Sequence, residues 1–259
     1  MYRKSAIVLC LLLVGVLGFT PVAGADELAK IKDAGQMKIA MSGAYPPFNF
    51  INEKNEVVGF DAAIGREIAR RLGVEPVIVT TAWDGILAGL LAKKYDTICG
   101  SMTITEKRQQ VVDFVGPYYR SGRGIFIRKD ETFATLADLM DKNIGVTLGE
   151  THEKWARTQK GWNIKTYKGL PELFLELENK RIDAIVIDSI PGLLAIKKTG
   201  KPIQIMDLPD IEGGDVNIGI AIRKNNPELK AAMQKALDDM MADGTYTQIS
   251  NEWIGSDIR

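Results

Sequence analysis

The stretch from Gly100 to Arg108 combines residue types that can bind a small carboxylic acid. It runs Gly-Ser-Met-Thr-Ile-Thr-Glu-Lys-Arg and follows a short apolar strand that is expected to end at Cys99. Small residues let a ligand approach the backbone, hydroxyl groups supply short donors, and the Arg108 guanidinium offers a planar fork that matches a carboxylate. The alternative is that the hydroxyl groups cap the following helix, as such residues often do, and that Arg108 is an ordinary surface residue.

Similar polar groups follow other apolar runs of the chain. Together with the first stretch, they occupy residues 42–45, 100–108, 149–152 and Asp188. In open α/β sheets, ligands bind beyond the carboxyl ends of the strands. Because all four groups follow predicted strands, we expect them to gather at one binding site, which favours the carboxylate interpretation of Arg108.

Helical and strand patterns alternate along the chain. Apolar residues recur every four positions over residues 60–72, which predicts a helix that Gly73 ends. A strand over residues 111–114 is expected to end at Gly116-Pro117, because proline cannot donate to a sheet. The alternation as a whole predicts an α/β fold in which mostly parallel sheets are flanked by helices.

The N-terminus has the features of a secretory signal peptide. Arg3 and Lys4 precede an apolar run over residues 6–19, and Ala23-Gly-Ala25 supplies small residues for cleavage. A retained membrane anchor is the alternative, but the run is short for a bilayer span. We therefore expect residues 1–25 to be a signal peptide cleaved after Ala25 and the mature protein to be exported.

Composition excludes several function classes. The chain has 33 basic and 33 acidic residues, so its charge gives no reason to expect a nucleic-acid partner. Cleavage would leave Cys99 as the single cysteine, and an intrachain disulfide needs two. His152 is the single histidine, which makes a zinc site of ordinary composition improbable. We expect no metal and no cofactor.

Six motifs together resemble a known family, the polar-amino-acid solute-binding proteins of bacterial ABC uptake transporters (family 3 extracellular solute-binding proteins). These motifs are Tyr45-Pro-Pro-Phe48, Gly59-Phe-Asp61, Trp83-Asp84, Met102-Thr-Ile-Thr-Glu-Lys-Arg108, Phe114-x-x-Pro-Tyr-Tyr119 and Asp183-Ala-Ile-Val-Ile-Asp188. The resemblance covers essentially the whole mature chain. It implies a two-lobed periplasmic-binding-protein fold with two crossing strands as a hinge, and places lobe 1 at residues 26–120 and 218–259 and lobe 2 at residues 121–217.

The resemblance also implies roles for individual residues. Arg108, helped by Ser101, Thr103 and Thr151, would bind the α-carboxylate of an amino acid. Asp188 and the Gly100 carbonyl would bind its α-ammonium, and Tyr45 and Trp83 would pack on its side chain. Two simpler interpretations remain open: Asp188 could be no more than the N-cap of the helix that begins at Pro191, and Trp83 could belong to the lobe core.

Three further residues are candidates for specificity. Ser42 stands where relatives that bind cationic amino acids often carry an acid. Glu150 and His152 flank Thr151, where small or amide residues are commoner. Glu150 would either meet a cationic side chain across the cleft or lie solvated in the first turn of a helix. His152 would either contact the ligand or be a bystander.

The expected function is capture of a free amino acid by a monomeric protein, which closes about its hinge and delivers the ligand to a membrane permease without catalysis. The alternative is an enzyme that resembles cyclohexadienyl dehydratases, which act on prephenate or arogenate. Glu150, His152 or Glu153 would then supply a general acid. The sequence identifies no second cation for the other carboxylate of prephenate.

Overall fold

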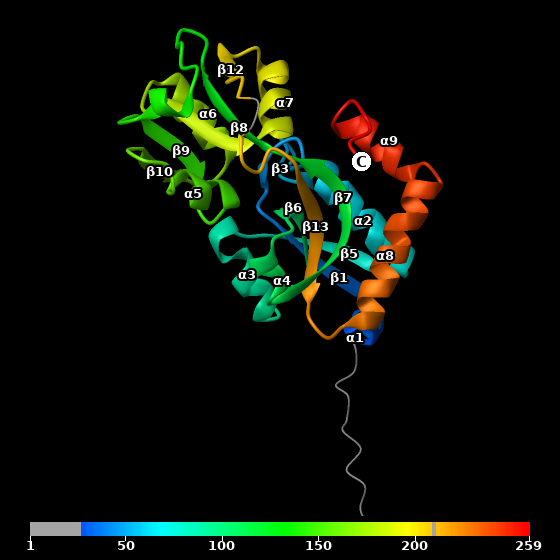
Figure 1. Cartoon of the computed structure of the whole chain (residues 1–259). Helices are drawn as coiled ribbons and strands as arrows, with labels where there is room; N and C mark the ends of the chain where they lie inside the picture. Colours follow the sequence, from blue (N-terminus) through cyan, green and yellow to red (C-terminus); the bar gives the residue numbers. More distant parts are fainter. Residues whose placement is uncertain (1–26, 209–210) are drawn as a thin grey trace, which may run out of the picture.

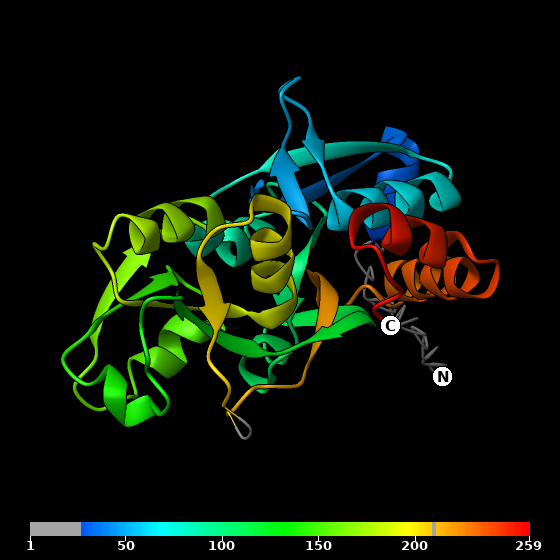
Figure 2. The ribbon, with the colours of Figure 1, turned by 90° about the horizontal axis from the view of Figure 1, so that it is seen from above.

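The computed structural model describes residues 27–208 and 211–259. The predicted signal peptide and its cleavage after Ala25 lie outside these residues. The described chain forms two five-stranded sheets and one small three-stranded sheet, with helices packed around them (Figure 1). Seen from above, helices α8 (Pro227–Ala242) and α9 (Thr245–Trp253) lie at one end of the molecule and the second large sheet lies at the other (Figure 2).

The first large sheet has four strands in one direction and one opposed. Its order is β5 (Glu75–Thr80), β1 (Gln36–Met41), β6 (Thr97–Thr103), β13 (Val216–Arg223) and β7 (Val112–Ser121). Strand β13 runs antiparallel to both of its neighbours. The small sheet, of β2 (Ala44–Tyr45), β3 (Asn49–Ile51) and β4 (Val57–Val58), follows β1 in the chain.

The second large sheet repeats this arrangement. Its order is β10 (Asn163–Tyr167), β9 (Asn143–Thr147), β11 (Ala184–Asp188), β8 (Arg123–Arg128) and β12 (Ile203–Ile205). Strand β8 is the one that runs against the others. The expectation of mostly parallel sheets flanked by helices is therefore confirmed.

Alternating side chains bury both faces of the first sheet. On β1, Ile39 and Met41 join the core formed with α1 (Glu27–Ala34), α2 (Phe60–Leu72), α8 and α9. Ala40 points to the other face, where it packs with Ile86 of α3 (Trp83–Leu91). This period of two is what a strand covered on both sides requires.

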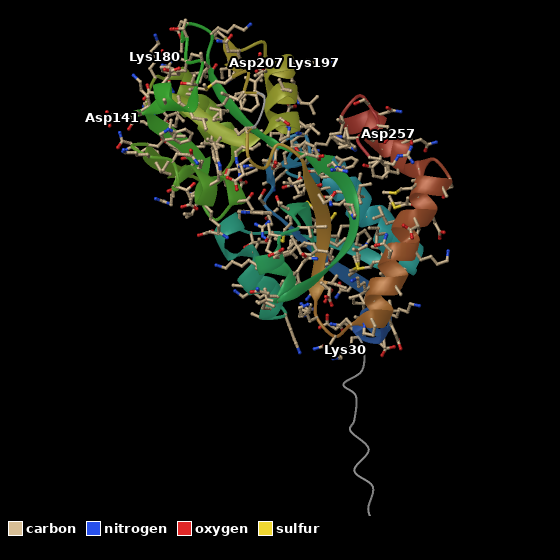
Figure 3. The ribbon with its side chains drawn as sticks, viewed as in Figure 1. Lys30, Asp141, Lys180, Lys197, Asp207 and Asp257 are labelled. Carbon is tan, nitrogen blue, oxygen red and sulfur yellow. The ribbon has the colours of Figure 1, made fainter. Side chains whose placement is uncertain are left out.

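The second sheet is covered in the same way. The short 3-10 helix η1 (Leu136–Leu139) and α5 (Thr151–Ala156) pack on one face. Helices α6 (Leu170–Glu178) and α7 (Ser189–Thr199) pack on the other. Charged side chains labelled in Figure 3, such as Asp141 and Lys180, lie on the outside of this part of the molecule.

Two predicted strand ends are wrong. Strand β7 continues through Gly116-Pro117 to Ser121, and β6 continues past Cys99 to Thr103. Among the described residues, β7 lies at the edge of its sheet and pairs with β13 alone. A proline is tolerated at an edge because its missing N–H breaks no central ladder. The helix over residues 60–72 is confirmed, and Gly73 ends it in the left-handed conformation.

The chain passes between the large sheets twice, after β7 and after β12. The two connections touch, because a Cβ on Gly122 would lie 1.7 Å from the carbonyl oxygen of Gly214. The division into lobes at residues 120–121 and 217–218 and the action of these connections as a hinge remain predictions. Within the described ranges, no helix is long and apolar enough to cross a bilayer.

Candidate functional site

A cavity lies between the ends of strands from both large sheets, with about 420 Å³ of empty space that includes space open to solvent. All eleven candidate residues from the sequence line it: Ser42, Tyr45, Trp83, Gly100, Ser101, Thr103, Arg108, Glu150, Thr151, His152 and Asp188. Residues that are far apart in the sequence but follow the ends of strands therefore meet at one place, as expected.

Arg108 reaches this cavity from the short helix α4 (Glu106–Gln109). The Thr105 hydroxyl accepts a hydrogen bond from the Arg108 backbone N–H at 3.2 Å and so caps the helix. The Arg108 guanidinium donates from Nη1 to the Thr103 carbonyl at 2.7 Å and lies 5.9 Å from the centre of the Trp83 ring. Arg108 is 8% exposed and burial lowers its pKa. Both interpretations of this stretch therefore hold in part: Thr105 caps the helix, and Arg108 places a buried cation at the cavity.

Asp188 approaches the cavity from the other large sheet. It ends β11 and occupies the N-cap position of α7, but its side chain forms no capping hydrogen bond. Instead, the Asp188 carboxylate accepts a hydrogen bond from the Tyr45 hydroxyl at 2.5 Å and lies 3.2 Å from His152 Nε2. The helix-cap interpretation is thus right about the position of Asp188 and wrong about its side chain.

Trp83 lies both at the cavity and against the core, the two positions between which the sequence did not decide. It lines the cavity, and it also packs, partly buried, against the core under α3. Tyr45 is buried at the wall of the cavity with its hydroxyl on Asp188 and its ring 6.0 Å from that of Phe48. Tyr45 therefore orients the acid as well as walling the pocket.

Glu150 and His152 carry buried polar atoms that have no hydrogen-bond partner among the described residues: Oε2 of Glu150 and Nδ1 of His152. Burial raises the pKa of Glu150 to about 7, and Asp188 adds to that rise while His152 and Arg108 oppose it. Buried polar groups are normally hydrogen-bonded. Both atoms belong to residues that line the cavity, which makes a polar ligand the natural partner for them.

Ser101 forms two hydrogen bonds beside the cavity. Its hydroxyl donates to Asp61 Oδ2 at 2.8 Å, because a carboxylate can only accept, and its backbone N–H donates to the Tyr118 hydroxyl at 3.0 Å. The Ser101 hydroxyl proton is therefore directed away from the cavity. With this proton on Asp61, the Ser101 oxygen can accept a hydrogen bond, which suits an ammonium; a role of Ser101 at the ligand carboxylate stays a prediction.

Asp61 is the centre of the network that fixes Ser101. Its carboxylate also accepts from the Tyr118 hydroxyl at 2.6 Å and from Asn49 Nδ2 at 2.7 Å. Burial raises the pKa of Asp61 to about 6 against the effect of these donors. Asn49 Oδ1 in turn accepts from the Ser42 hydroxyl at 2.9 Å. The Ser42 hydroxyl is thus engaged in the turn after β1, although Ser42 lines the cavity.

Three residues of the lining lie outside the stretches that the sequence indicated: Thr147, Lys168 and Gly169. A fourth, Ala44, lies within the expected stretch 42–45 without having been singled out. Thr147 ends β9, and Lys168-Gly169 follow the end of β10. The expectation that ligands bind beyond the ends of strands therefore also applies to Thr147, Lys168 and Gly169. No group of three or more His, Cys, Asp or Glu side chains that could hold a metal ion occurs in the described part of the chain.

The chain is similar to proteins of one family. A family model for bacterial extracellular solute-binding proteins, family 3, matches residues 37–256. The L-cystine-binding protein TcyJ of Escherichia coli (strain K12) is 34% identical over 261 residues, which cover 95% of this chain and 96% of that protein.

Solved structures agree with this match. A mutant of ArgBP from T. maritima has a TM-score of 0.82 at 34% identity and covers 88% of this chain and 99% of that chain. An ancestral amino acid-binding protein, described as a precursor of cyclohexadienyl dehydratase, has a TM-score of 0.81 at 32% identity and covers 88% and 99% of the two chains. The chain therefore belongs to the family 3 bacterial extracellular solute-binding proteins.

Proposed function

We propose that the protein captures a free amino acid in the cavity between its two large sheets and delivers it to the permease of an ABC transporter. The observation that carries the proposal is that Arg108 and Asp188, which come from different sheets, line the same cavity. One supplies a cation and the other an anion, as the two ends of a zwitterion require. Membership of the family supports the same function.

The proposed binding mode assigns each end of the ligand to a set of groups. The α-carboxylate pairs with the Arg108 guanidinium, helped by Thr103 and Thr151, and such pairs are strong because the donor and acceptor are both charged. The α-ammonium meets Asp188, the Gly100 carbonyl and the oxygen of Ser101, whose hydroxyl proton is directed to Asp61. The ligand side chain packs between Tyr45 and Trp83, with Glu150 and His152 as the polar groups that it can reach.

Family membership also supports the cellular setting that we propose. The protein acts in the periplasm as a monomer after cleavage behind Ala25. Its two lobes, residues 26–120 with 218–259 and residues 121–217, close over the ligand about the two connections. The closed form, with both lobes in contact with the ligand, is the one that the permease recognises.

The proposal is tested by titrating the purified mature protein with a panel of free amino acids that includes L-cystine, which the similar protein from E. coli is named for binding. We expect one or a few of them to raise the melting temperature, since a ligand at one hundred times its Kd stabilises the folded state by about 2.7 kcal/mol. Arg108→Ala should abolish this shift, because it leaves the carboxylate without its partner, at a cost of about 2–5 kcal/mol.

Lys107→Ala is the matched control, because Lys107 is exposed on the same helix and does not line the cavity. It should bind the ligand as the unaltered protein does. An unchanged shift in Arg108→Ala would overturn the assigned site. Failure of every amino acid to shift the transition, after unfolding and refolding has removed any ligand that co-purified, would overturn the proposed function.

The dehydratase alternative has some support in the site. Glu150 has a pKa of about 7, which suits a general acid, and Lys168 supplies the second cation that the sequence did not identify. We nevertheless propose a binding protein and not an enzyme, because transport proteins are what the family and the similar L-cystine-binding protein represent.

An assay for phenylpyruvate release from prephenate separates the two functions. We expect no release above the uncatalysed rate, for the unaltered protein and for Glu150→Gln alike. Turnover by the unaltered protein that Glu150→Gln removes would establish the enzyme.

A further inference from the structure

The motif Gly59-Phe-Asp61 supplies a buried acid behind the wall of the cavity. Asp61 lies in the first turn of α2, is 0% exposed and is not itself part of the cavity wall. Its carboxylate accepts hydrogen bonds from the side chains of Asn49, Ser101 and Tyr118. Ser101 is the member of this network that also lines the cavity, so it joins the acid to the place where the ligand binds.

The negative charge of Asp61 has no cation beside it among the described residues. Its three hydrogen-bond donors are neutral, and no described Lys, Arg or His side chain forms an ion pair with it. The N-terminus of α2 contributes only a partial positive charge. Burial therefore raises the pKa of Asp61 to about 6, although the three hydrogen bonds oppose this rise. A buried carboxylate in this condition is stabilised by any positive charge that arrives close to it.

The Ser101 hydroxyl can carry the influence of this charge to the cavity. Its proton lies on Asp61, so its oxygen can only accept a further hydrogen bond. A negatively charged acceptor polarises the hydroxyl, and in a chain of hydrogen bonds such polarisation strengthens the next bond. The Ser101 oxygen therefore becomes a better acceptor for a positively charged donor in the cavity.

The backbone at Ser101 has an unusual conformation that the same network holds. The φ angle of Ser101 is 60°, in the left-handed region that residues other than glycine seldom adopt. The Ser101 N–H donates to the Tyr118 hydroxyl, which in turn donates to Asp61. Asp61 and Tyr118 thus fix both the backbone and the side chain of Ser101. Residues in such conformations persist where their surroundings enforce them, and they cluster at functional sites.

We propose that Asp61 is a second anion of the ammonium site, which acts on the α-ammonium of the ligand through the Ser101 hydroxyl while Asp188 contacts the ammonium directly. Asp61 is a positioning residue, because it does not touch the ligand. The resulting selectivity is for molecules that carry an ammonium beside their carboxylate, against the same carboxylic acids without it. This inference rests on the proposed function of the cavity.

Asp61→Asn removes the charge with little change of shape. Because Asn49 Nδ2 can only donate, the carbonyl oxygen of the new side chain takes the place of Oδ2, and Ser101 keeps an acceptor there. The probes are the amino acid that the panel identifies and the same molecule with hydrogen in place of its ammonium. Examples of such pairs are L-arginine with guanidinovalerate and L-histidine with imidazolepropionate.

Calorimetric titration at pH 8 should show that Asp61→Asn weakens binding of the amino acid about ten-fold, because a charge close to the ammonium is lost from a buried site. The Kd of the analogue, measured by displacement of the amino acid, should change by less than about two-fold, since the analogue has no ammonium for the charge to act on. Glu67→Gln is the control, because Glu67 lies on the same helix and does not line the cavity. It should bind both probes as the unaltered protein does.

Ser101→Ala tests whether the charge acts through the hydroxyl. This change should itself weaken binding of the amino acid, because it removes the acceptor. When Asp61→Asn is added to it, the further loss should be less than about three-fold, since the chain of hydrogen bonds that carries the effect is already broken.

The pH dependence of binding is a readout that a purely structural role of Asp61 would not change. The titratable groups that act on Asp61 from the elements packed around it are Cys99 of β6, Tyr118 and Tyr119 of β7, Tyr246 of α9 and Asp188 of β11. Burial raises the pKa of the cysteine and of the three tyrosines, so these four groups stay neutral between pH 5 and pH 8.

Because the ammonium of the ligand favours ionised Asp61, the affinity for the amino acid should be lost as the pH falls through about 6. Between pH 8 and pH 5, we expect a loss about five-fold greater in the unaltered protein than in Asp61→Asn. The titratable groups of the cavity, Glu150 among them, are common to both proteins, so the difference isolates Asp61. If Asp61→Asn does not fold, the comparison is made with Ser101→Ala, which should likewise show the weaker dependence on pH.

Three outcomes would overturn the role of Asp61 and leave the amino-acid site in place. They are unchanged binding of the amino acid by Asp61→Asn, an equal loss for the amino acid and its analogue, and an undiminished effect of Asp61→Asn in the Ser101→Ala protein. If no amino acid binds to the unaltered protein, the proposed function itself fails.

Discussion

Glu150 is the residue whose chemistry the sequence could least anticipate. A glutamate at the start of a helix is usually solvated and ionised, but here its Oε2 is buried without a partner in the described chain and its pKa rises to about 7. Because the pKa in the folded protein lies above its usual value of 4.5, the buried carboxyl prefers its proton more than an unfolded one does. The stabilisation from this group is complete below about pH 4.5 and is lost as the pH rises through about 7.

Glu150→Gln should therefore flatten the pH dependence of stability. In urea unfolding of the ligand-free protein, we expect the free energy of unfolding to fall between pH 5 and pH 8 by on the order of 2 kcal/mol more in the unaltered protein than in Glu150→Gln. Asp61 titrates in the same direction with a pKa of about 6, but it is common to both proteins, so the difference between them isolates Glu150.

Glu53→Gln, a change at an exposed glutamate outside the site, serves as the control and should retain the pH dependence of the unaltered protein. A fall between pH 5 and pH 8 that is equal in Glu150→Gln and the unaltered protein would contradict the assignment of this pKa to Glu150.

Individual residues also show how far sequence reasoning reaches. Arg108 and Asp188 were predictable, because strand ends meet at one edge of a sheet and their charges match a zwitterion. The hydrogen bond that the Ser101 hydroxyl donates was not, because its acceptor Asp61 lies 40 residues away in the sequence. A hydroxyl group can donate or accept, and only the tertiary structure decides which it does.

At the scale of elements, the chain was most predictable where periodicity was long. Helix α2 has the predicted bounds because its apolar stripe spans the whole segment and a glycine ends it. Strands β6 and β7 continue through the glycine and proline residues that predict their ends. Whether a strand tolerates a glycine or a proline depends on where that strand lies in the sheet. The local sequence does not reveal this position. The same holds for the opposed directions of β8 and β13, which become visible only from their pairing with neighbouring strands.

At the scale of the molecule, helix α6, which covers the second large sheet, meets the small sheet closely beside the cavity. Gly169, at the start of α6, is backed against β2, and a Cβ at this position would lie 2.6 Å from the Ala44 carbonyl oxygen. The φ angle of Gly169 is 176°, an extended conformation that any residue adopts. Glycine is therefore needed here for space between the two parts of the molecule and not for backbone freedom.

Gly169→Val should weaken ligand binding by holding the two parts of the molecule apart. We expect the Kd of the cognate amino acid to rise at least about ten-fold, since a clash of this size costs more than 1.4 kcal/mol. The melting temperature of the ligand-free protein should stay within a few degrees, because an open form relieves the clash. Calorimetric titration measures the first quantity and a thermal melt the second.

Gly85→Ala is the matched control, because a Cβ at Gly85 meets nothing within 4 Å. It should leave the Kd unchanged. A Gly169→Val protein that binds as tightly as the unaltered one would show that close approach at this contact is not needed for binding.

The contact between Gly122 and Gly214 has a consequence for how such a chain can be recombined. The backbones of the two connections between the sheets touch where any side chain would collide, so a change in the course of one connection requires a matching change in the other. A chimera that inherits residues 121–123 from one parent and residues 211–216 from another combines two connections whose backbones do not match at this contact. We expect functional chimeras to inherit both segments from the same parent, although nearly one hundred residues separate them in the sequence.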